Sequence, residues 1–201
     1  MGRKEKITLW LVLIAGIVLL LGSCGDYRGP GTDNIENTGI ILVVSDIMPQ
    51  DRGEDTYDID IVQHVCPSGE PEDPLTDATL RVELYYEKGP ACSSDTGKEC
   101  PNINILSYRV EFFSDNDSAY PLPDLNVITQ NIHLSPDSSV ELEGLLLIPV
   151  SWKDELATKG NPNDVIVYQV KVTFYGVTDY GYEVKTWAQT FIEVADWDVC
   201  Q

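Results

Sequence analysis

The stretch Ile166-Val167-Tyr168-Gln169-Val170-Lys171-Val172-Thr173-Phe174 indicates the fold class, because a large apolar residue recurs at every second position. Successive side chains of a β-strand point to opposite faces of a sheet. The residues that this spacing places on one face are Ile166, Tyr168, Val170, Val172 and Phe174. Most of the residues between them are polar, so the stretch predicts a strand with one buried and one exposed face.

The same period-two pattern recurs along the chain, divided by turn signals such as Pro67-Ser68-Gly69 and Ser135-Pro136-Asp137. The apolar residues expected to point inward are Ile40 to Val44; Ile59, Ile61 and Val65; Leu80, Val82, Leu84 and Tyr86; Leu106, Tyr108, Val110 and Phe112; Ile128, Ile132 and Leu134; Val140, Leu142, Leu146 and Ile148; and Val184, Ala188, Ile192 and Val194. About eight short strands separated by turns predict an all-β sandwich.

One short helical turn is expected near 152–157, between the last two groups of strands. Ser151 is expected to cap its free backbone N–H groups, and the acidic residues Asp154 and Glu155 are expected in its first turn, where they suit the helix dipole.

The segment Tyr168 to Phe174, a short turn and Tyr182 to Val194 together resemble the last hairpin of an immunoglobulin or fibronectin type III domain. Ser107 to Phe112 is similar to the third strand of such a domain. The resemblance covers roughly residues 55–198 and implies an immunoglobulin-like β-sandwich, with Tyr168 as the tyrosine of the corner motif. The usual inter-sheet cysteine pair is missing, and Ile40 to Val44 is expected as an additional strand.

The N-terminus has the pattern of a secretory signal peptide. Three cations precede Ile7 to Leu21, a run of 15 residues without charge. A retained membrane helix needs about 20 apolar residues, so cleavage is the better interpretation. Leu21-Gly22-Ser23-Cys24 resembles the lipobox of bacterial lipoproteins, which implies a signal peptide over 1–23 and a thioether-linked diacylglycerol with a further amide-linked acyl chain, such as palmitate, on Cys24.

Behind Cys24, the Gly-, Asp- and Asn-rich segment 24–39 is expected to be a flexible tether, and 40–201 a single β-sandwich domain. In the enterobacterial sorting rule, aspartate directly after the lipid-bearing cysteine retains a lipoprotein at the inner membrane. Gly25 stands at this position and Asp26 follows it, which favours the outer membrane by resemblance. The combination of anchor and sandwich resembles a group of uncharacterised lipoproteins from environmental Gram-negative bacteria.

The charge of the mature chain excludes several kinds of partner. Removing residues 1–23 takes away three cations and Glu5, which leaves 10 Lys and Arg against 32 Asp and Glu, a net charge of −22. Nucleic-acid binding needs clustered cations, and docking on anionic lipid needs them too. The acyl chains are therefore the expected membrane contact, and no nucleic-acid partner is expected.

No motif of catalysis or of cofactor binding is present. G-x-S-x-G, S-x-x-K, H-E-x-x-H and a phosphate loop after a strand are all absent from the sequence, so we expect neither an enzyme nor a cofactor. Calcium is the weak metal alternative, because acidic residues gather in two segments without the spacing of an EF-hand. The candidates are Asp51, Glu54, Asp55 and Asp58 in the first segment, and Asp115 and Asp117 in the second.

Four cysteines besides Cys24 predict two disulfides in an oxidising compartment. Cys92 and Cys100 flank a short segment between two strands and are expected to pair, which leaves Cys66 with Cys200. In an immunoglobulin-like sandwich the first strand runs parallel to the last, so the resemblance implies that the strands before Cys66 and Cys200 end at the same end of the domain.

Exposed aromatic residues provide the best functional lead. Trp187 and Phe191 alternate with the inward Ala188 and Ile192, and Tyr175 lies on the matching face of the preceding strand. Aromatic groups on a flat sheet predict a partner-binding surface, unless the tether or Ile40 to Val44 folds over them. We therefore expect a non-catalytic interaction or structural module with a protein or glycan partner. The alternatives are a carbohydrate-binding or hydrolase accessory and a calcium-binding surface domain.

Overall fold

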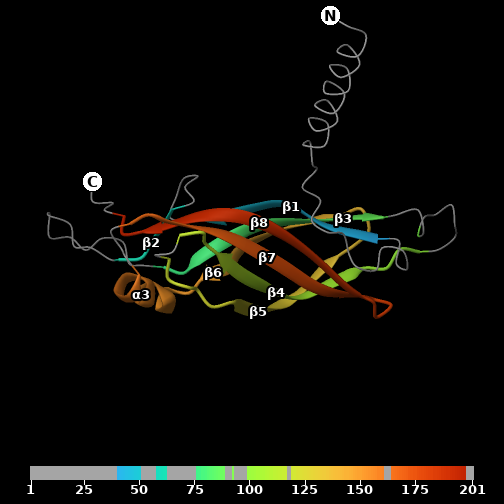
Figure 1. Cartoon of the computed structure of the whole chain (residues 1–201). Coiled ribbons are helices and arrows are strands. Elements are labelled where there is room, and N and C mark those ends of the chain that lie inside the picture. The colour runs from blue at the N-terminus through green and yellow to red at the C-terminus, as the bar shows by residue number, and fades with distance from the viewer. Residues whose placement is uncertain are drawn as a thin grey trace, which may run out of the picture.

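The computed structural model describes residues 40–50, 58–62, 76–88, 92, 99–116, 119–160 and 164–197. The expected signal peptide, Cys24 and the tether lie outside these ranges. Two sheets pack face to face, and the sandwich is elongated along its strands (Figure 1). One sheet has the order β1 (Ile40–Gln50), β3 (Ala78–Lys88), β6 (Ser139–Ile148); the other has the order β2 (Asp58–Asp60), β8 (Glu183–Ala195), β7 (Ile166–Thr178), β4 (Ile103–Phe113), β5 (Leu125–Leu134).

This topology confirms the expected all-β sandwich, with eight strands and one helix, α3 (Val150–Lys159), in the described residues. Each strand pairs antiparallel to its neighbours, except that β2 runs parallel to β8. The parallel pair joins Asp58 to Glu193 and Asp60 to Ala195. The expected parallel course of the first and last strands of the five-stranded sheet is thus confirmed over these residues.

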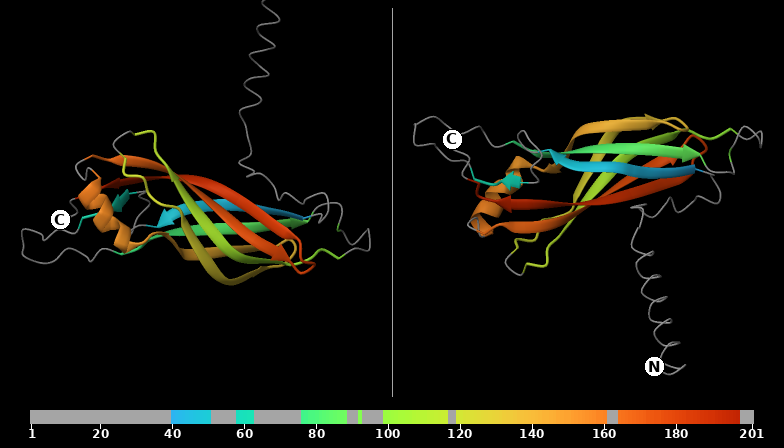
Figure 2. Two further views of the ribbon diagram at one scale, coloured as in Figure 1. Left: turned by 60° about the horizontal axis from the view of Figure 1, so that its bottom comes forward. Right: turned by 90° about the horizontal axis from the view of Figure 1, so that it is seen from above.

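Ile40 to Val44 forms a strand, as expected, and it belongs to the three-stranded sheet. These residues begin β1, which pairs antiparallel with β3 along its whole length and forms one edge of the three-stranded sheet. The next described strand, β2, belongs to the other sheet (Figure 2). The alternative that Ile40 to Val44 covers the aromatic residues of β8 from outside was wrong.

The core follows the alternation of the central strands. The inward residues of the opening stretch are all buried, as are Leu80, Val82, Leu84 and Tyr86 of β3, which faces them from the other sheet. Such close burial of apolar surface stabilises the fold by about 25 cal/mol per Å² removed from water. The period-two interpretation is confirmed where a strand is regular.

Where a strand carries a bulge, the interpretation was wrong. The register of β4 shifts between Ile105 and Ser107 against both neighbours, which turns Leu106 outward with 45% of its surface exposed. Ile128 of β5 pairs with Ser107 on the outer face and is 89% exposed. An extra residue reverses which face the following side chains occupy, so a pattern read across a bulge assigns one side of it wrongly.

A second irregularity changes which side chains of β6 point into the core. Its register against β3 shifts between Leu80 and Val82, and Gly144 takes a positive φ of 71° there. Beyond the shift, Leu147 is buried in place of the expected Leu146. The backbone carbonyl of Leu146 still has a partner from the core, because it accepts a hydrogen bond of 3.0 Å from the hydroxyl of the buried Tyr108.

The helix begins earlier than expected, and this changes its cap. Pro149 occupies the N-cap position and no side chain of the adjoining residues caps the helix. The carboxylate of Asp77, which precedes β3, accepts the backbone N–H of Val150. The prediction of a Ser151 cap with acidic residues in the first turn was wrong, because the first turn contains no acidic residue.

Tyr168 lies in the buried part of β7. The corner motif implies a hydrogen bond from its hydroxyl to the backbone a few residues upstream, but the hydroxyl has a more distant partner. Its hydroxyl donates a hydrogen bond of 2.7 Å to the carbonyl of Tyr120, in the connection between β4 and β5. The Phe112 ring packs edge-on against Tyr168, with the ring centroids 6.4 Å apart. Tyr168 therefore ties β7 to the β4–β5 connection.

Candidate binding face

The outer face of the five-stranded sheet is ordered in rows that cross its strands. The register gives a hairpin-end row (Ile128, Ser107, Tyr175, Lys185), a central belt of two rows (Asn126, Arg109, Thr173, Trp187; and Glu111, Lys171, Gln189) and a distal row (Phe113, Gln169, Phe191). Apolar side chains therefore occur at both ends of the face, and apart from Trp187 the side chains between them are polar.

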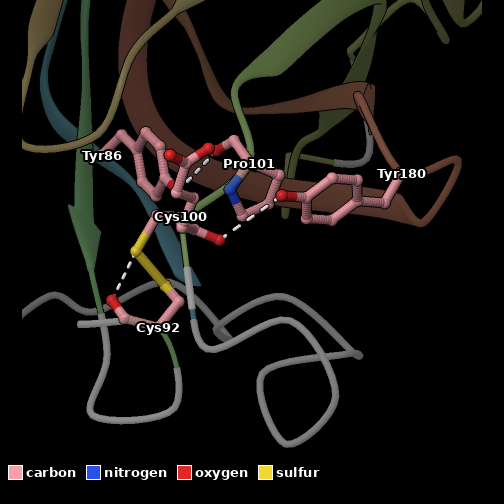
Figure 3. Close-up of a disulfide and its surroundings, with 6 residues drawn as sticks. Tyr86, Cys92, Cys100, Pro101 and Tyr180 are labelled. Carbon is pink, nitrogen blue, oxygen red and sulfur yellow. Dashed lines mark hydrogen bonds between the residues drawn. A yellow bond between two sulfur atoms is a disulfide. The ribbon is translucent and has the colours of Figure 1, made fainter. Parts of the chain in front are cut away.

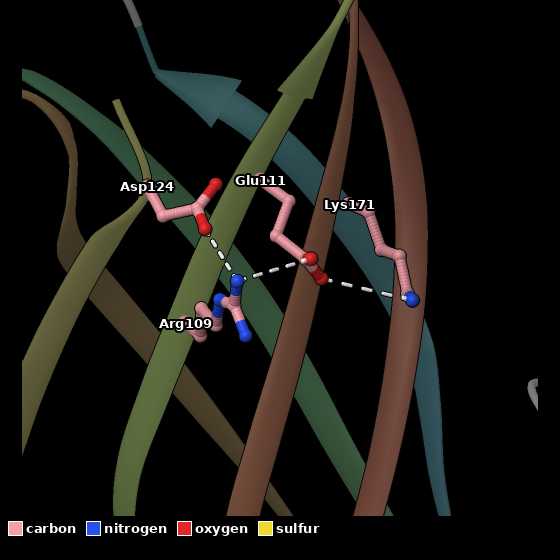
Figure 4. A network of polar contacts seen from close by, with 4 residues as sticks. All are labelled: Arg109, Glu111, Asp124 and Lys171. Atoms are coloured by element: carbon pink, nitrogen blue, oxygen red, sulfur yellow. Dashed lines mark hydrogen bonds and ion pairs between the residues drawn. The ribbon is translucent and has the colours of Figure 1, made fainter. Parts of the chain in front are cut away.

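The charges of the central belt are paired with one another (Figure 4). The Arg109 guanidinium forms an ion pair with the Asp124 carboxylate and lies 3.5 Å from a Glu111 carboxylate oxygen. The other Glu111 oxygen lies 3.7 Å from the Lys171 ammonium, which in turn lies 5.5 Å from the centre of the Trp187 ring. The belt is thus electrically balanced, and Trp187 is half-buried on the same face as Lys171.

At the distal row, four apolar side chains form what we call the distal patch: Phe113, Val165, Val167 and Phe191. Phe113 is 48% and Phe191 56% exposed, and both valines are exposed as well. A hollow of about 240 Å³ lies among these residues and Gln169. The Ser114 hydroxyl donates a hydrogen bond of 2.8 Å to the Val167 carbonyl, which fixes the end of β4 against β7. The patch therefore has a fixed shape.

The outer face of the three-stranded sheet is different. Asp46, Glu83 and Glu141 lie in one row across β1, β3 and β6, and Glu143 is exposed nearby. Arg81 forms an ion pair with Glu141. Carboxylates side by side repel one another and favour hydration, so this row has the character of a solvated surface.

The structure places all three predicted aromatic residues on the outer face of the five-stranded sheet, but it divides them. Tyr175 lies in the hairpin-end row and Phe191 pairs with Gln169 in the distal row. Six residues of a strand separate Tyr175 from Gln169, or about 20 Å at 3.3 Å per residue. Tyr175 and Phe191 consequently belong to separate apolar areas.

Sequence reasoning missed three members of the distal patch: Phe113, Val165 and Val167. Phe113 and Val167 stand at positions of their strands where the alternation calls for a polar residue. An apolar residue at a polar position was the signal that could have identified them. Their proximity to Phe191, however, follows only from the pairing of β7 with both β4 and β8.

The expected metal and lipid residues fall largely outside the described residues, which include neither Cys24 nor the calcium candidates Asp51, Glu54, Asp55 and Asp117. Asp58 lies in β2, and Asp115 is exposed after β4. Within the described ranges, no group of three or more His, Cys, Asp or Glu side chains is arranged to hold a metal ion.

Cys92 and Cys100 form a disulfide, with their Cα atoms 5.0 Å apart (Figure 3). Next to it, the Tyr86 hydroxyl donates a hydrogen bond of 2.7 Å to the Pro101 carbonyl, and the Tyr180 hydroxyl lies 3.5 Å from the Glu99 carbonyl. The disulfide therefore lies where the end of β3, the start of β4 and the β7–β8 turn meet. Cys66 and Cys200 are outside the described residues.

Comparison with known protein families, with curated proteins and with solved structures finds no match for this chain. In the part of the chain that the structure describes, no helix has the length and apolar character needed to cross a membrane.

Proposed function

We propose that the chain is a lipid-anchored module of the bacterial outer membrane that binds a protein partner and catalyses no reaction. The observation that carries the proposal is the contrast between the two outer faces of the sandwich. The five-stranded sheet exposes Phe113, Val167 and Phe191, with Val165 directly before β7, whereas a row of carboxylates crosses the three-stranded sheet. Contiguous exposed apolar residues beside polar ones are characteristic of binding surfaces.

The composition of the face favours protein over glycan. Protein interfaces are enriched in aromatic residues and arginine and surround an apolar centre with polar groups. The distal patch combines aromatic with aliphatic side chains, and Arg109 and Lys171 lie beside it in the belt. Sugar recognition uses the flat faces of aromatic rings, to which Val165 and Val167 add nothing.

The membrane anchor is supported by the sequence alone. The uncharged run Ile7 to Leu21 followed by Leu21-Gly22-Ser23-Cys24 supplies the signal and the acceptor cysteine. Several acyl chains on one residue give stable anchoring, since each buried methylene contributes about 0.8 kcal/mol. Cys24→Ser should abolish incorporation of a radioactive fatty acid and release the protein from the membrane fraction. Unchanged labelling of this variant would refute the anchor.

Site-specific crosslinking in the producing cell tests the binding face. A photoreactive amino acid at Phe191 should give an adduct of defined mass, whereas the same amino acid at Glu143, on the opposite outer face, should give none. Equal adducts at both positions, or none at Phe191, would contradict the proposal.

The double variant Phe113→Ser with Phe191→Ser provides a second measurement on the same face. Because both rings are about half exposed, the free energy of unfolding should fall by well under the roughly 3–5 kcal/mol that truncation of a buried aromatic costs. The adduct formed from a photoreactive group at the neighbouring Gln169 should disappear in this variant. An adduct of unchanged yield would show that the distal patch does not contribute.

Carbohydrate binding is the second candidate, favoured by the rings of Phe113, Trp187 and Phe191 on one flat sheet face. Aromatic rings offer rigid apolar faces that sugars stack upon. Calorimetric titration with soluble envelope saccharides should give no heat of binding if the partner is a protein. Binding that the Phe113→Ser with Phe191→Ser variant abolishes would favour the saccharide instead.

A further inference from the structure

We infer that the end of the sandwich carrying the β7–β8 turn rests on the lipid surface to which Cys24 is anchored, and that the distal patch points away from it. This inference rests on the lipid anchor of the proposed function. It concerns a surface that we call the hairpin-end cluster: Leu106, Ile128, Tyr175, Tyr180 and Tyr182.

The start of β1 lies beside the end of β3. Ile40 starts β1 opposite Lys88, the last residue of β3. The end of β3 adjoins the start of β4 through the Tyr86–Pro101 hydrogen bond, and Ile103 of β4 pairs with Thr178 at the end of β7. The start of β1 and the β7–β8 turn thus lie at the same end of the sandwich (Figure 2).

Only a short length of chain separates the proposed anchor from the start of β1. Sixteen residues, 24–39, precede Ile40. A Gly-rich chain of this length spans about 20 Å on average. In contrast, Thr178 follows Gln169 by nine positions along β7, which places the distal row about 30 Å from the turn. The tether therefore keeps the hairpin end, rather than the distal patch, close to the bilayer.

The β7–β8 turn carries exposed tyrosine side chains. Tyr180 is 57% and Tyr182 45% exposed. Tyrosine is enriched at membrane–water interfaces, because its ring enters the apolar boundary while its hydroxyl stays hydrated. Leu106 and Ile128 are exposed on the same end of the outer face, and a hollow of about 620 Å³ lies between Leu106, Tyr175 and Gly181. The end thus presents apolar and amphipathic groups together.

The turn is also held in a fixed shape. Thr178 donates its N–H to the Tyr182 carbonyl at 2.9 Å, and Gly181 donates to the Thr178 carbonyl at 2.8 Å. Gly181 has a φ of 83°, which glycine adopts without strain. The Asp179 carboxylate accepts a hydrogen bond of 2.6 Å from the Asn102 side chain, so the turn is braced against the start of β4. The backbone of the turn that carries Tyr180 and Tyr182 is therefore held in place before any contact with lipid.

Charge restricts the kind of lipid. The carboxylates of Glu99, Asp179 and Glu183 lie at the same end, and the mature chain carries a net charge of −22. Anionic headgroups would be repelled. The surface therefore fits lipid headgroups without net charge, such as phosphatidylcholine or phosphatidylethanolamine.

The test uses the full lipidated protein in phosphatidylcholine vesicles that contain lipids brominated close to the headgroup, because bromine quenches tryptophan fluorescence on contact. Tyr180→Trp adds a tryptophan at the turn, and Phe191→Trp adds a matched one in the distal patch. The fluorescence of the unsubstituted protein is subtracted from each. We expect quenching of the added tryptophan at position 180 and none at position 191.

Flotation of the vesicles separates the failure of the orientation from the failure of the anchor. Protein that floats with the vesicles while the tryptophan at position 180 stays unquenched, or is quenched no more than that at position 191, would overturn the orientation and leave the anchor intact. Protein that does not float with the vesicles would overturn both.

Discussion

Replacing Cys66 and Cys200 together by Ser tests how the edge of the five-stranded sheet is secured. The described part of this edge is small, since β2 pairs with β8 only from Asp58 to Asp60. Beyond the pair, the Ile61 N–H donates to the Ala195 carbonyl at 3.1 Å, and the Trp197 N–H donates to the Asp60 carboxylate at 3.3 Å. The two parallel segments therefore leave the sheet side by side.

Cys66 follows Asp60 by six residues and Cys200 follows Ala195 by five, so we expect the two cysteines to be joined. The disulfide would close a loop of 135 residues. The chain-entropy relation gives about 5 kcal/mol for a loop of this length, which is an upper figure because measured gains often fall short. For the nine-residue loop between Cys92 and Cys100 it gives about 2.6 kcal/mol.

Urea denaturation compares the Cys66→Ser, Cys200→Ser pair with the Cys92→Ser, Cys100→Ser pair as a control. The first pair should lower the free energy of unfolding more than the second, by up to about 2.4 kcal/mol. Hydrogen exchange at the Ile61 amide should also accelerate in the first pair, because a short edge strand opens readily once it is released. Peptide mapping without reduction that joins Cys66 to Cys92 or Cys100, or an equal loss in both pairs, would refute the reasoning.

Four further measurements test the fold and the surface. Tyr168→Phe removes the hydrogen bond to the Tyr120 carbonyl and should lower the free energy of unfolding by about 1 kcal/mol in urea denaturation; a loss no larger than that of Tyr175→Phe, an exposed control, would contradict this role. Hydrogen bonds from the side chains of Asn102 and Asn104 lower the pKa of Asp179, so its contribution to stability is present above pH ~4 and is lost as the pH falls through the folded pKa. Asp179→Asn should therefore flatten the acid side of the stability curve, and an unchanged acid side would argue against the brace. Burial raises the pKa of Tyr168 to about 12. The stability that its neutral phenol contributes below pH ~10 is therefore lost as the pH rises toward 12. Ultraviolet titration that shows every tyrosine ionising near pH 10 in the folded protein would be inconsistent with the burial of Tyr168. Calorimetric titration with calcium should give a dissociation constant weaker than about 10⁻⁵ M, the range of sensor sites, and tighter binding would reveal a calcium site.

The strands that could be predicted from the sequence are those in which burial alone decides the pattern. In β3 and β7, every second side chain is buried in the core. The alternation of apolar and polar residues therefore identifies the buried face directly. The same logic located Trp187 and Phe191 on an outer face. It failed at Leu106, Ile128 and Leu146, because a bulge reverses the face of a strand and leaves no local mark in the sequence.

The amino-acid sequence by itself determined the fold class, the presence of the helix, the Cys92–Cys100 pair and the acidic character of the chain. The tertiary structure decided which strands are neighbours: β1 beside β3, β2 parallel to β8, and β7 between β4 and β8. Period-two alternation fixes a side chain only relative to its own strand, whereas a surface joins side chains from strands far apart in the chain. Phe113 and Phe191 therefore meet in one patch, and Tyr175 lies apart from them, because β7 pairs with both β4 and β8. The alternation within a single strand does not indicate this pairing.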